Sequence, residues 1–370
     1  MSNAANPHLL DPFVGQEVQV NKQDLRITRI VGVTRSSLVS GAARLRLDVC
    51  SMTSNNVTYA AMGEAPAGYW DFFPASDAWG RPPVWGFATV VESAVAELEL
   101  GSRHFGFFPL SQTLDVIPVK AGARGFIDGA PHRAAKVSFY NQYADTRTDP
   151  AYDPDREAEQ VLLRPLYPSG WWTADRVRQD DPRTVVISSA SSKTALATAH
   201  KLRSVGNAEL VALTSGRHAD YVRGTGLYTR TVTYGEVSTL KATASVTYVD
   251  FLGNEAVNAA VHDALGSTLA VSLLLGATDW ASKPGGVRVP SAVGQGPQPE
   301  ALMIPIYAPQ RLKIDRELGA TMLRDMRAFY AASGTLVRPL HLSGMKAALD
   351  CWAQLATGKA LPHEGFVLSF

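Results

Sequence analysis

RTVVISSASSKTALATAHKLRSVGNAELVALTSGR, residues 183–217, is the stretch of this 370-residue chain that decides the fold. It begins with the β-branched run Thr184–Ile187, which is typical of a strand buried on both faces. Residues 194–205 show a helical pattern that ends at Gly206 and Asn207, and residues 210–213 predict a second strand. The stretch therefore predicts a strand–turn–helix–strand unit of nucleotide-binding type.

The turn between the first strand and the helix carries hydroxyl groups and no glycine. The usual G-x-G-x-x-G sequence lets the backbone approach a pyrophosphate at a helix N-terminus. Here phosphate could instead be held by first-turn N–H groups, by serine hydroxyls and by a lysine as a point charge. A serine-rich N-cap on an ordinary helix explains the same residues equally well. The candidate phosphate ligands are Ser189, Ser191, Ser192, Lys193 and Thr194.

The end of the second strand favours NADP over NAD. An NAD site places Asp or Glu there to bind the ribose hydroxyls, but the nearest acid is Asp220, one helical turn too late. Ser215 and Arg217 stand where a 2′-phosphate would lie, and a guanidinium suits a phosphate dianion. The alternative is a solvated arginine in a loop. We expect NADPH as the cofactor.

Composition describes a soluble globular protein. Hydrophobic residues make up 46% and charged residues 19%, and 370 residues suggest about two domains. A formal net charge of +1 indicates neither nucleic acid nor an anionic membrane as a partner. Cys50 and Cys351 cannot form a disulfide framework, so a cytoplasmic location is expected. The sequence shows no secretory signal, and its longest apolar run is too short to span a bilayer.

The chain changes character along its length. Residues 16–20, 43–49 and 84–91 predict closely spaced strands, as in a barrel or sandwich. After residue 183, strands alternate with helices, among them a strand at 246–251 and a helix at 316–333. A helix at residues 345–357 and a closing strand at 365–370 follow, and the last strand could return to the first module. A β-rich module thus precedes a β/α module.

Three further segments resemble one family when their order and spacing are considered together. They are LDVCSMTSNNVTY at 47–59, PVWGFATVV at 83–91 and LGSRHFG at 100–106. The chain resembles the medium-chain dehydrogenases/reductases, and within them the zinc-independent quinone oxidoreductase and enoyl reductase branch. The resemblance covers nearly the whole chain, but the Ser/Lys turn replaces the family's glycine-rich turn, which suggests a divergent subfamily of unassigned function.

The resemblance implies an α/β fold with two parts. Residues 1–155 and 336–370 would form a GroES-like β-barrel catalytic domain, and residues 156–335 a Rossmann-type, doubly wound parallel sheet that binds NADP. It also implies that no metal is bound, since the positions of the zinc ligands hold residues 53–55 and 85–87, none of which is a Cys, His or Glu. The four cysteines of a structural zinc site are missing as well.

Without a metal, a side chain must stabilise the enolate that forms when a hydride reaches an activated C=C bond, and then supply a proton. Tyrosine can do both. Tyr69 is the leading candidate because enoyl reductases of this resemblance carry a tyrosine in the same loop. Tyr59, Asn55 and Asn56 lie on the segment expected near the nicotinamide, and Tyr140 is a weaker candidate. A tyrosine in an aromatic loop is more often only a packed residue.

Other residues are expected beside the coenzyme because they follow parallel strands, where open α/β sheets bind ligands. They are Tyr234, Phe251, Leu252, Gly253, Gly276 and Thr278. Glycine after a strand is equally an ordinary turn residue. The aromatic loop at residues 70–85 is either core or the wall of a pocket for an apolar or conjugated substrate. Residues 269–275 could pair edge to edge with a second copy to give a homodimer.

Two functions from different classes follow. The first is an NADPH-dependent reductase of an enone, quinone or enoyl ester or thioester, with carbonyl reduction as a close variant. The second is a non-catalytic NADPH-binding protein that kept the fold, since the glycines of the turn are lost.

Overall fold

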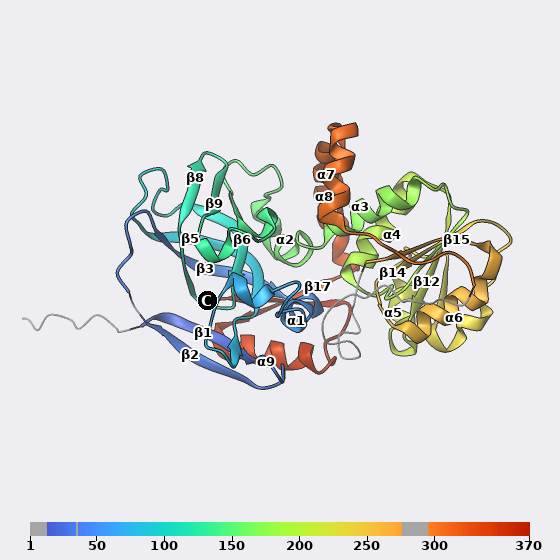
Figure 1. The fold of residues 1–370 in the computed structure, drawn as a ribbon, viewed down its shortest axis with the longest axis horizontal. Coiled ribbons are helices and arrows are strands. Elements are labelled where there is room, and N and C mark those ends of the chain that lie inside the picture. Colours follow the sequence, from blue (N-terminus) through green and yellow to red (C-terminus); the bar gives the residue numbers. More distant parts are fainter. Residues whose placement is uncertain (1–12, 35, 276–294) are drawn as a thin grey trace, which may run out of the picture.

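The computed structural model describes residues 13–34, 36–275 and 295–370, and it has two lobes (Figure 1). One lobe is rich in β-strands from both ends of the chain, and the other is built on a parallel sheet from its middle. We call them the β-rich lobe and the Rossmann lobe. The mixed α/β fold class predicted from the sequence is confirmed.

The β-rich lobe contains a three-stranded sheet in the order β2-β1-β4 and a nine-stranded sheet in the order β17-β18-β3-β5-β6-β10-β9-β8, with β7 beside β3. In β3, Leu45 and Leu47 are buried and Arg46 between them is exposed, as alternation predicts. β18 pairs antiparallel with β3, so the C-terminal segment completes this lobe. The strands are β1 (Phe13–Asn21), β2 (Thr28–Thr34), β3 (Ala43–Met52), β4 (Trp79–Gly80), β5 (Pro83–Ser93), β6 (Arg103–Pro109), β7 (Thr113–Val116), β8 (Pro118–Gly122), β9 (Gly125–Asp128), β10 (Gln142–Asp145), β17 (Arg338–Ser343) and β18 (Glu364–Ser369).

The Rossmann lobe has a six-stranded parallel sheet in the order β13-β12-β11-β14-β15-β16. Its strands are β11 (Thr184–Ile187), β12 (Glu209–Thr214), β13 (Arg230–Thr233), β14 (Val246–Asp250), β15 (Leu269–Leu274) and β16 (Glu300–Ala301). The strand order reverses between β11 and β14, which is where such sheets bind ligands. β16 pairs with Leu273 and Leu274, so the edge that the sequence placed on β15 is occupied there.

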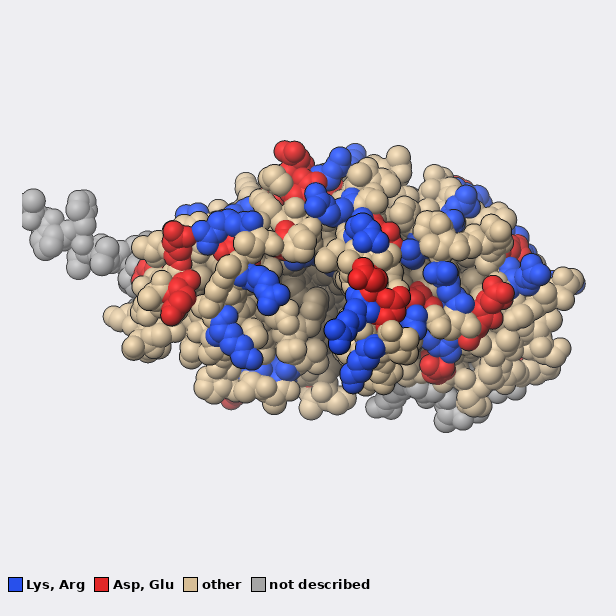
Figure 2. All heavy atoms as spheres, turned by 90° about the horizontal axis from the view of Figure 1, so that it is seen from above, with Lys and Arg blue, Asp and Glu red and all other residues tan. Residues whose placement is uncertain are grey.

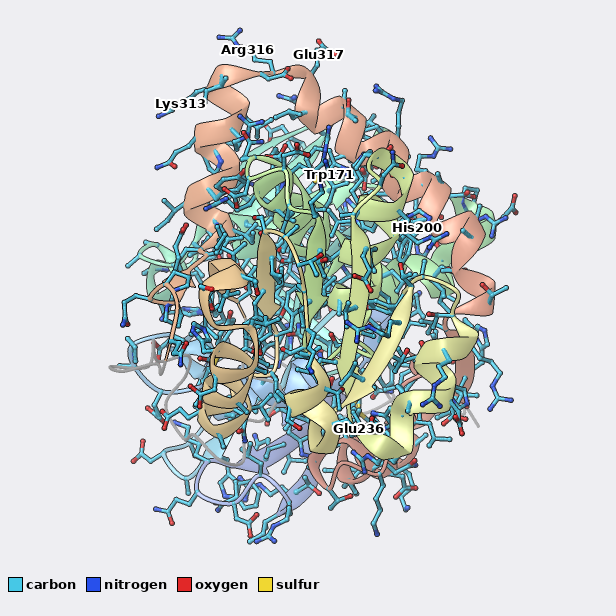
Figure 3. The ribbon with its side chains drawn as sticks, turned by 90° about the vertical axis from the view of Figure 1, so that its right-hand side faces the viewer. Trp171, His200, Glu236, Lys313, Arg316 and Glu317 are labelled. Atoms are coloured by element: carbon cyan, nitrogen blue, oxygen red, sulfur yellow. The ribbon has the colours of Figure 1, made fainter. Side chains whose placement is uncertain are left out.

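The helices cover both lobes. They are α1 (Ser54–Ala61), α2 (Glu157–Leu163), α3 (Tyr167–Arg178), α4 (Lys193–Val205), α5 (Ala219–Gly224), α6 (Glu255–Leu265), α7 (Ile304–Ile314), α8 (Glu317–Ala332) and α9 (Gly344–Ala356). α7 and α8 form a hairpin that projects from the body (Figure 1), and Lys313, Arg316 and Glu317 mark its tip (Figure 3). Among the described residues, the helices lack the combination of length and apolar character needed to cross a membrane.

The largest apolar core extends through both lobes. It joins Trp85 and Phe107 of the β-rich sheet to Val185 and Leu196 of the Rossmann lobe by way of α2 and α3. Seen from above, the surface is hollowed where the lobes meet, and Lys and Arg side chains border the hollow on both sides (Figure 2). The lobes are therefore packed together over a continuous interior, with an indentation between them at the surface.

Candidate functional site

The glycine-free turn between β11 and α4 forms an N-cap with unused donors. The Ser192 hydroxyl accepts from the Ala195 N–H at 3.3 Å and caps α4. Within the described chain, the main-chain N–H groups of Ser191, Lys193 and Thr194 find no acceptor. The serine-cap interpretation is therefore confirmed, and phosphate binding stays a prediction that the free N–H groups of the turn allow.

Ser189 departs from the expected arrangement. Its φ of 49° lies in the left-handed region that glycine adopts without strain, so the missing glycine has a local conformational cost. The Ser189 N–H donates to the hydroxyl of Tyr234 at 3.1 Å. Tyr234, expected beside the coenzyme, is therefore bonded to the Ser/Lys turn itself. This N–H group is not available to a phosphate unless the tyrosine moves.

Lys193 stands at the first residue of α4 and reaches the other lobe. Its ammonium donates to the main-chain carbonyl oxygen of Glu364 in β18 at 3.0 Å. Burial lowers the pKa of Lys193 to about 8, because desolvation disfavours the charged amine and no carboxylate offsets it. The amine is thus a cation without a counter-charge, at a helix N-terminus that itself favours an anion.

Two further basic side chains follow β12. Arg217 is exposed and donates to the main-chain carbonyl oxygen of Gly358 at 3.3 Å. His218 Nδ1 shares a hydrogen bond of 3.2 Å with the Ser191 hydroxyl, and burial together with the charge of Arg217 lowers its pKa. Among the described residues, the buried hydroxyl oxygen of Ser215 has no hydrogen-bond partner. These residues connect the end of β12 to the turn before α4.

The basic cluster of Lys193, Arg217 and His218 contains no ion pair in the part of the chain that the structure describes. Lys193 and Arg217 were predicted from the sequence, whereas His218 was not. The signal was its position directly after Arg217, but only the fold shows that its ring faces Ser191. Three basic groups without a carboxylate, beside free N–H groups, are what an anion-binding site requires.

Asp250 fixes the turn after β14, opposite the Ser/Lys turn. Its buried carboxylate accepts from the Ser188 hydroxyl at 2.6 Å and from the N–H groups of Leu252 and Gly253 at 2.9 and 3.1 Å. The Ser188 hydroxyl oxygen in turn accepts from the Phe251 N–H at 2.9 Å. The structure therefore places Phe251, Leu252 and Gly253 in one rigid turn beside the start of α4. Gly276 and Thr278 lie outside the described residues.

Three tyrosines predicted as catalytic come together from separate segments. Tyr59 lies on α1, Tyr69 in the 3₁₀ turn Tyr69–Phe72, and Tyr140 in the 3₁₀ turn Ser138–Asn141. The hydroxyls of Tyr69 and Tyr140 share a hydrogen bond of 3.0 Å, and the Trp85 indole N–H donates to the Tyr59 hydroxyl at 3.3 Å. Asn55, four residues before Tyr59 on α1, interacts with the Tyr59 hydroxyl and acts to lower its pKa. Four of the five predicted catalytic residues therefore form one cluster.

The surroundings keep these phenols protonated. Burial raises the pKa of Tyr59, Tyr69 and Tyr140 above the ordinary value for tyrosine, because a phenolate would lose its hydration. Tyr59 is buried, whereas Tyr69 and Tyr140 are partly exposed. At neutral pH the cluster thus consists of proton donors.

Asn56, the fifth predicted residue, has a different role. Its amide oxygen accepts from the Thr53 N–H at 2.7 Å, and its amide nitrogen donates to the Pro83 carbonyl oxygen at 2.8 Å. The side chain is buried, and both ends serve to start α1 and join it to β5. Asn56 on the segment near the nicotinamide stays a prediction, although both polar atoms of its side chain are already bonded within the protein.

Aromatic rings surround the tyrosine cluster. Their burial shows whether the aromatic loop at residues 70–85 is core or the wall of a pocket. Phe72 and Phe107 are buried, with their ring centroids 5.4 Å apart. Phe139, in contrast, is 48% exposed although its ring centroid lies 5.1 Å from that of Trp85. The aromatic side chains of the loop at residues 70–85 are therefore mostly core, and Phe139, which lies outside that loop, presents an apolar surface to solvent. Two cavities lie next to Arg44 on the β-rich lobe: the one of about 230 Å³ is also lined by Phe72 and Phe73, and the one of about 330 Å³ is not.

Comparisons with known proteins identify the fold. A search of the curated proteins finds no match. The model of a family described as a protein of unknown function, DUF2855, matches residues 50–361. No described group of three or more His, Cys, Asp and Glu side chains is arranged to hold a metal ion.

Solved structures match over nearly the full length. The crystal structure of CurA in complex with NADPH from Vibrio vulnificus has a TM-score of 0.62 and 11% identity, covering 96% of this chain and 98% of that one. The quinone oxidoreductase from Coxiella burnetii has a TM-score of 0.53 and 11% identity, with coverages of 96% and 99%. The CurF ER cyclopropanase from the curacin A biosynthetic pathway has 0.59 and 13%, with coverages of 96% and 99%. The medium-chain dehydrogenase/reductase fold expected from the sequence is confirmed.

Proposed function

We propose that this chain, which belongs to the DUF2855 family of proteins of unknown function, is an NADPH-dependent oxidoreductase that reduces an activated C=C bond. The observation that carries the proposal is the basic cluster of Lys193, Arg217 and His218, which lacks carboxylate partners and lies beside the free N–H groups of α4. Such a cluster at the carboxyl ends of β11 and β12 suits a phosphorylated dinucleotide. That a similar fold, CurA, was solved with NADPH agrees with this.

The residues present fit both charged groups of the coenzyme, the diphosphate and the 2′-phosphate. Lys193 and the first-turn N–H groups of α4 would hold the diphosphate, together with the hydroxyls of Ser191 and Ser192. Arg217, His218 and the unpartnered hydroxyl of Ser215 would hold the 2′-phosphate. When bound, the coenzyme supplies a hydride.

The tyrosine cluster would perform the acid part of the reaction. A protonated phenol donates a hydrogen bond to an oxygen that gains negative charge, and it then serves as a proton source. Tyr69 is our choice for this role because it is partly exposed and its hydroxyl is held at 3.0 Å by that of Tyr140. Tyr59, anchored by Trp85 and Asn55, supports it from the buried side.

The substrate class follows from the exposed ring of Phe139 and the phenols behind it. A flat, conjugated molecule such as an enone, a quinone or an enoyl ester or thioester would use both features, since it offers an apolar face and one oxygen. Carbonyl reduction needs the same donors and remains the closest variant. We also propose that the protein acts without zinc and in the cytoplasm. We further propose that it forms a homodimer, and light scattering would measure the mass of that dimer.

One observation favours a second function, that of a non-catalytic coenzyme-binding protein. The Ser189 N–H is bonded to Tyr234, and a serine takes the left-handed conformation suited to glycine. Both features reduce the backbone surface that a diphosphate can approach. If the protein binds NADPH without oxidising it, the conformation of this turn would explain the lack of activity.

Calorimetric titration with NADPH and NADH tests the proposal. We expect NADPH to bind more tightly than NADH, and Arg217→Ala to weaken NADPH selectively. An equal loss for both coenzymes would contradict the 2′-phosphate assignment. NADPH oxidation is then followed with an enone, a quinone and an aldehyde. Binding without oxidation of NADPH by any of them supports the second function, and failure to bind either coenzyme at millimolar concentration removes both.

A further inference from the structure

Three side chains of the Rossmann lobe donate hydrogen bonds to main-chain carbonyl oxygens of the C-terminal segment, residues 336–364. Lys193 donates to Glu364 at 3.0 Å, Arg217 to Gly358 at 3.3 Å, and Tyr221 to Leu336 at 2.8 Å. All three acceptors lie in the part of the chain that contains β17, α9 and the start of β18. The residues that would bind the coenzyme phosphates therefore already contact the β-rich lobe.

Two of these donors, Lys193 and Arg217, have further N–H groups that could donate to a ligand. The Lys193 ammonium has three N–H groups and the Arg217 guanidinium five, and each uses one toward a carbonyl oxygen. Neither has a carboxylate partner in the described part of the chain. A phosphate could therefore bind to each cation without displacing the carbonyl oxygen. Each cation would then join a phosphate on one side to the C-terminal segment on the other.

The C-terminal segment leads directly to the tyrosine cluster. Glu364 begins β18, and Phe366 of β18 pairs with Met52 of β3. β3 ends at Met52, and the next residue, Thr53, caps α1, which carries Tyr59. The connection is stiff because Gly365 lies against Leu162 of α2, where an added Cβ would come within 2.5 Å of the leucine side chain. A displacement at Glu364 would therefore act on β3, the strand that leads into α1.

We propose that Lys193 and Arg217 are positioning residues that link the phosphates of the bound coenzyme to the C-terminal segment and so set the position of the tyrosine cluster relative to the nicotinamide. This inference rests on the proposed function. It goes beyond phosphate binding because it gives each cation a second partner in the other lobe.

The direction of the effect follows from electrostatics. The pKa of the Lys193 amine is lowered to about 8 by burial, so near that pH a large fraction of the amine is neutral. A phosphate next to it supplies the missing counter-charge and favours the ammonium. An ammonium donates a stronger hydrogen bond to the Glu364 carbonyl oxygen than a neutral amine does. Coenzyme binding should therefore tighten the contact between the lobes.

Hydrogen–deuterium exchange with mass spectrometry tests the inference on the full chain. With saturating NADPH, we expect exchange at residues 358–366 and 53–61 to slow by about tenfold, within the usual range of coupling between sites. Lys193→Met should bind NADPH more weakly and, when saturated, show no slowing at these residues. Lys193→Arg should restore it, because the guanidinium again has donors for both partners. Arg223→Met is the control, since Arg223 is exposed on α5 and its ion pair in the described part of the chain is with the exposed Asp220.

The outcomes separate the inference from the proposed function. If NADPH binds the wild-type chain and exchange at residues 358–366 is unchanged or faster, the positioning role is refuted and NADPH binding stands. Slowing in Lys193→Met equal to that in the wild type refutes it in the same way. If neither coenzyme binds, both proposals fall. If Lys193 had a purely structural role, its substitution would change exchange to the same extent with and without NADPH.

Discussion

At the scale of single residues, the hydroxyl of Tyr69 is the group on which the proposed reduction depends most. Removing it in Tyr69→Phe leaves the ring packed but takes away the accessible proton donor. We expect kcat to fall about 10²- to 10⁴-fold, the usual contribution of a general acid, with the Kd for NADPH unchanged. Steady-state kinetics with the accepted substrate measures this.

Tyr330→Phe provides the matched control for this substitution. Tyr330 is buried on α8, and its hydroxyl has no hydrogen-bond partner. Deleting that hydroxyl should leave kcat unchanged and should not lower stability, because a buried unpaired group is removed. If Tyr69→Phe behaves like Tyr330→Phe, Tyr69 is only a packed residue.

Lys193 gives the site a pH dependence. Because the pKa of the free amine is lowered to about 8 and phosphate binding raises it, NADPH affinity should be fully present below pH 8 and fall as pH rises above it. The decrease approaches about tenfold per pH unit until the pKa of the bound state is reached. Titrations between pH 7.5 and 9.5 measure it. Lys193→Arg should bind with a flat profile, and a flat profile in the wild type would show that this amine does not meet a phosphate.

At the scale of elements, the turns after β11 and β14 stabilise each other through Ser188 and Asp250. Asp250→Ala would leave the Ser188 hydroxyl and the N–H groups of Leu252 and Gly253 without their acceptor. We expect a loss of about 3 kcal/mol in the free energy of unfolding by urea. Ser188→Ala should cost less alone and add little to Asp250→Ala, because the two side chains act as a pair. Full additivity would mean that the two turns are independent.

The elements that could be predicted from the sequence are those with a strong period. β11, α4 and β14 were predicted within one or two residues because their apolar positions repeat and their ends carry caps. α7 was not predicted, and Pro309 inside it is unusual for a helix, because proline lacks the N–H that the helix interior uses. The positions of Tyr234 and His218 against the turn could not be predicted either. Each depends on how one loop lies over another, which no local pattern in the sequence describes.

The same limit explains the outcome for the tyrosines and for Asn56. Residue chemistry and the family resemblance predicted Tyr59, Tyr69 and Tyr140, and the fold brings them together from three segments, while their catalytic role stays a prediction. Chemistry was not sufficient for Asn56, because an amide suits a helix cap as well as a coenzyme contact. Only the neighbours of the side chain distinguish the two roles.

At the scale of the whole molecule, the continuous core predicts how the protein unfolds. Trp85 and Phe107 share one apolar cluster with Val185 and Leu196, although these pairs belong to different lobes. Since neither lobe can separate without exposing this cluster, we expect one calorimetric transition with equal calorimetric and van't Hoff enthalpies. Leu162→Ala on α2, between the lobes, should lower stability by about 2–5 kcal/mol and keep a single transition. Val119→Ala, at a position 41% exposed, should change it by less than about 0.5 kcal/mol. Two separate transitions in the wild type would mean that the lobes fold independently, and the link from the phosphates to the tyrosines would then lack the rigid interface that it requires.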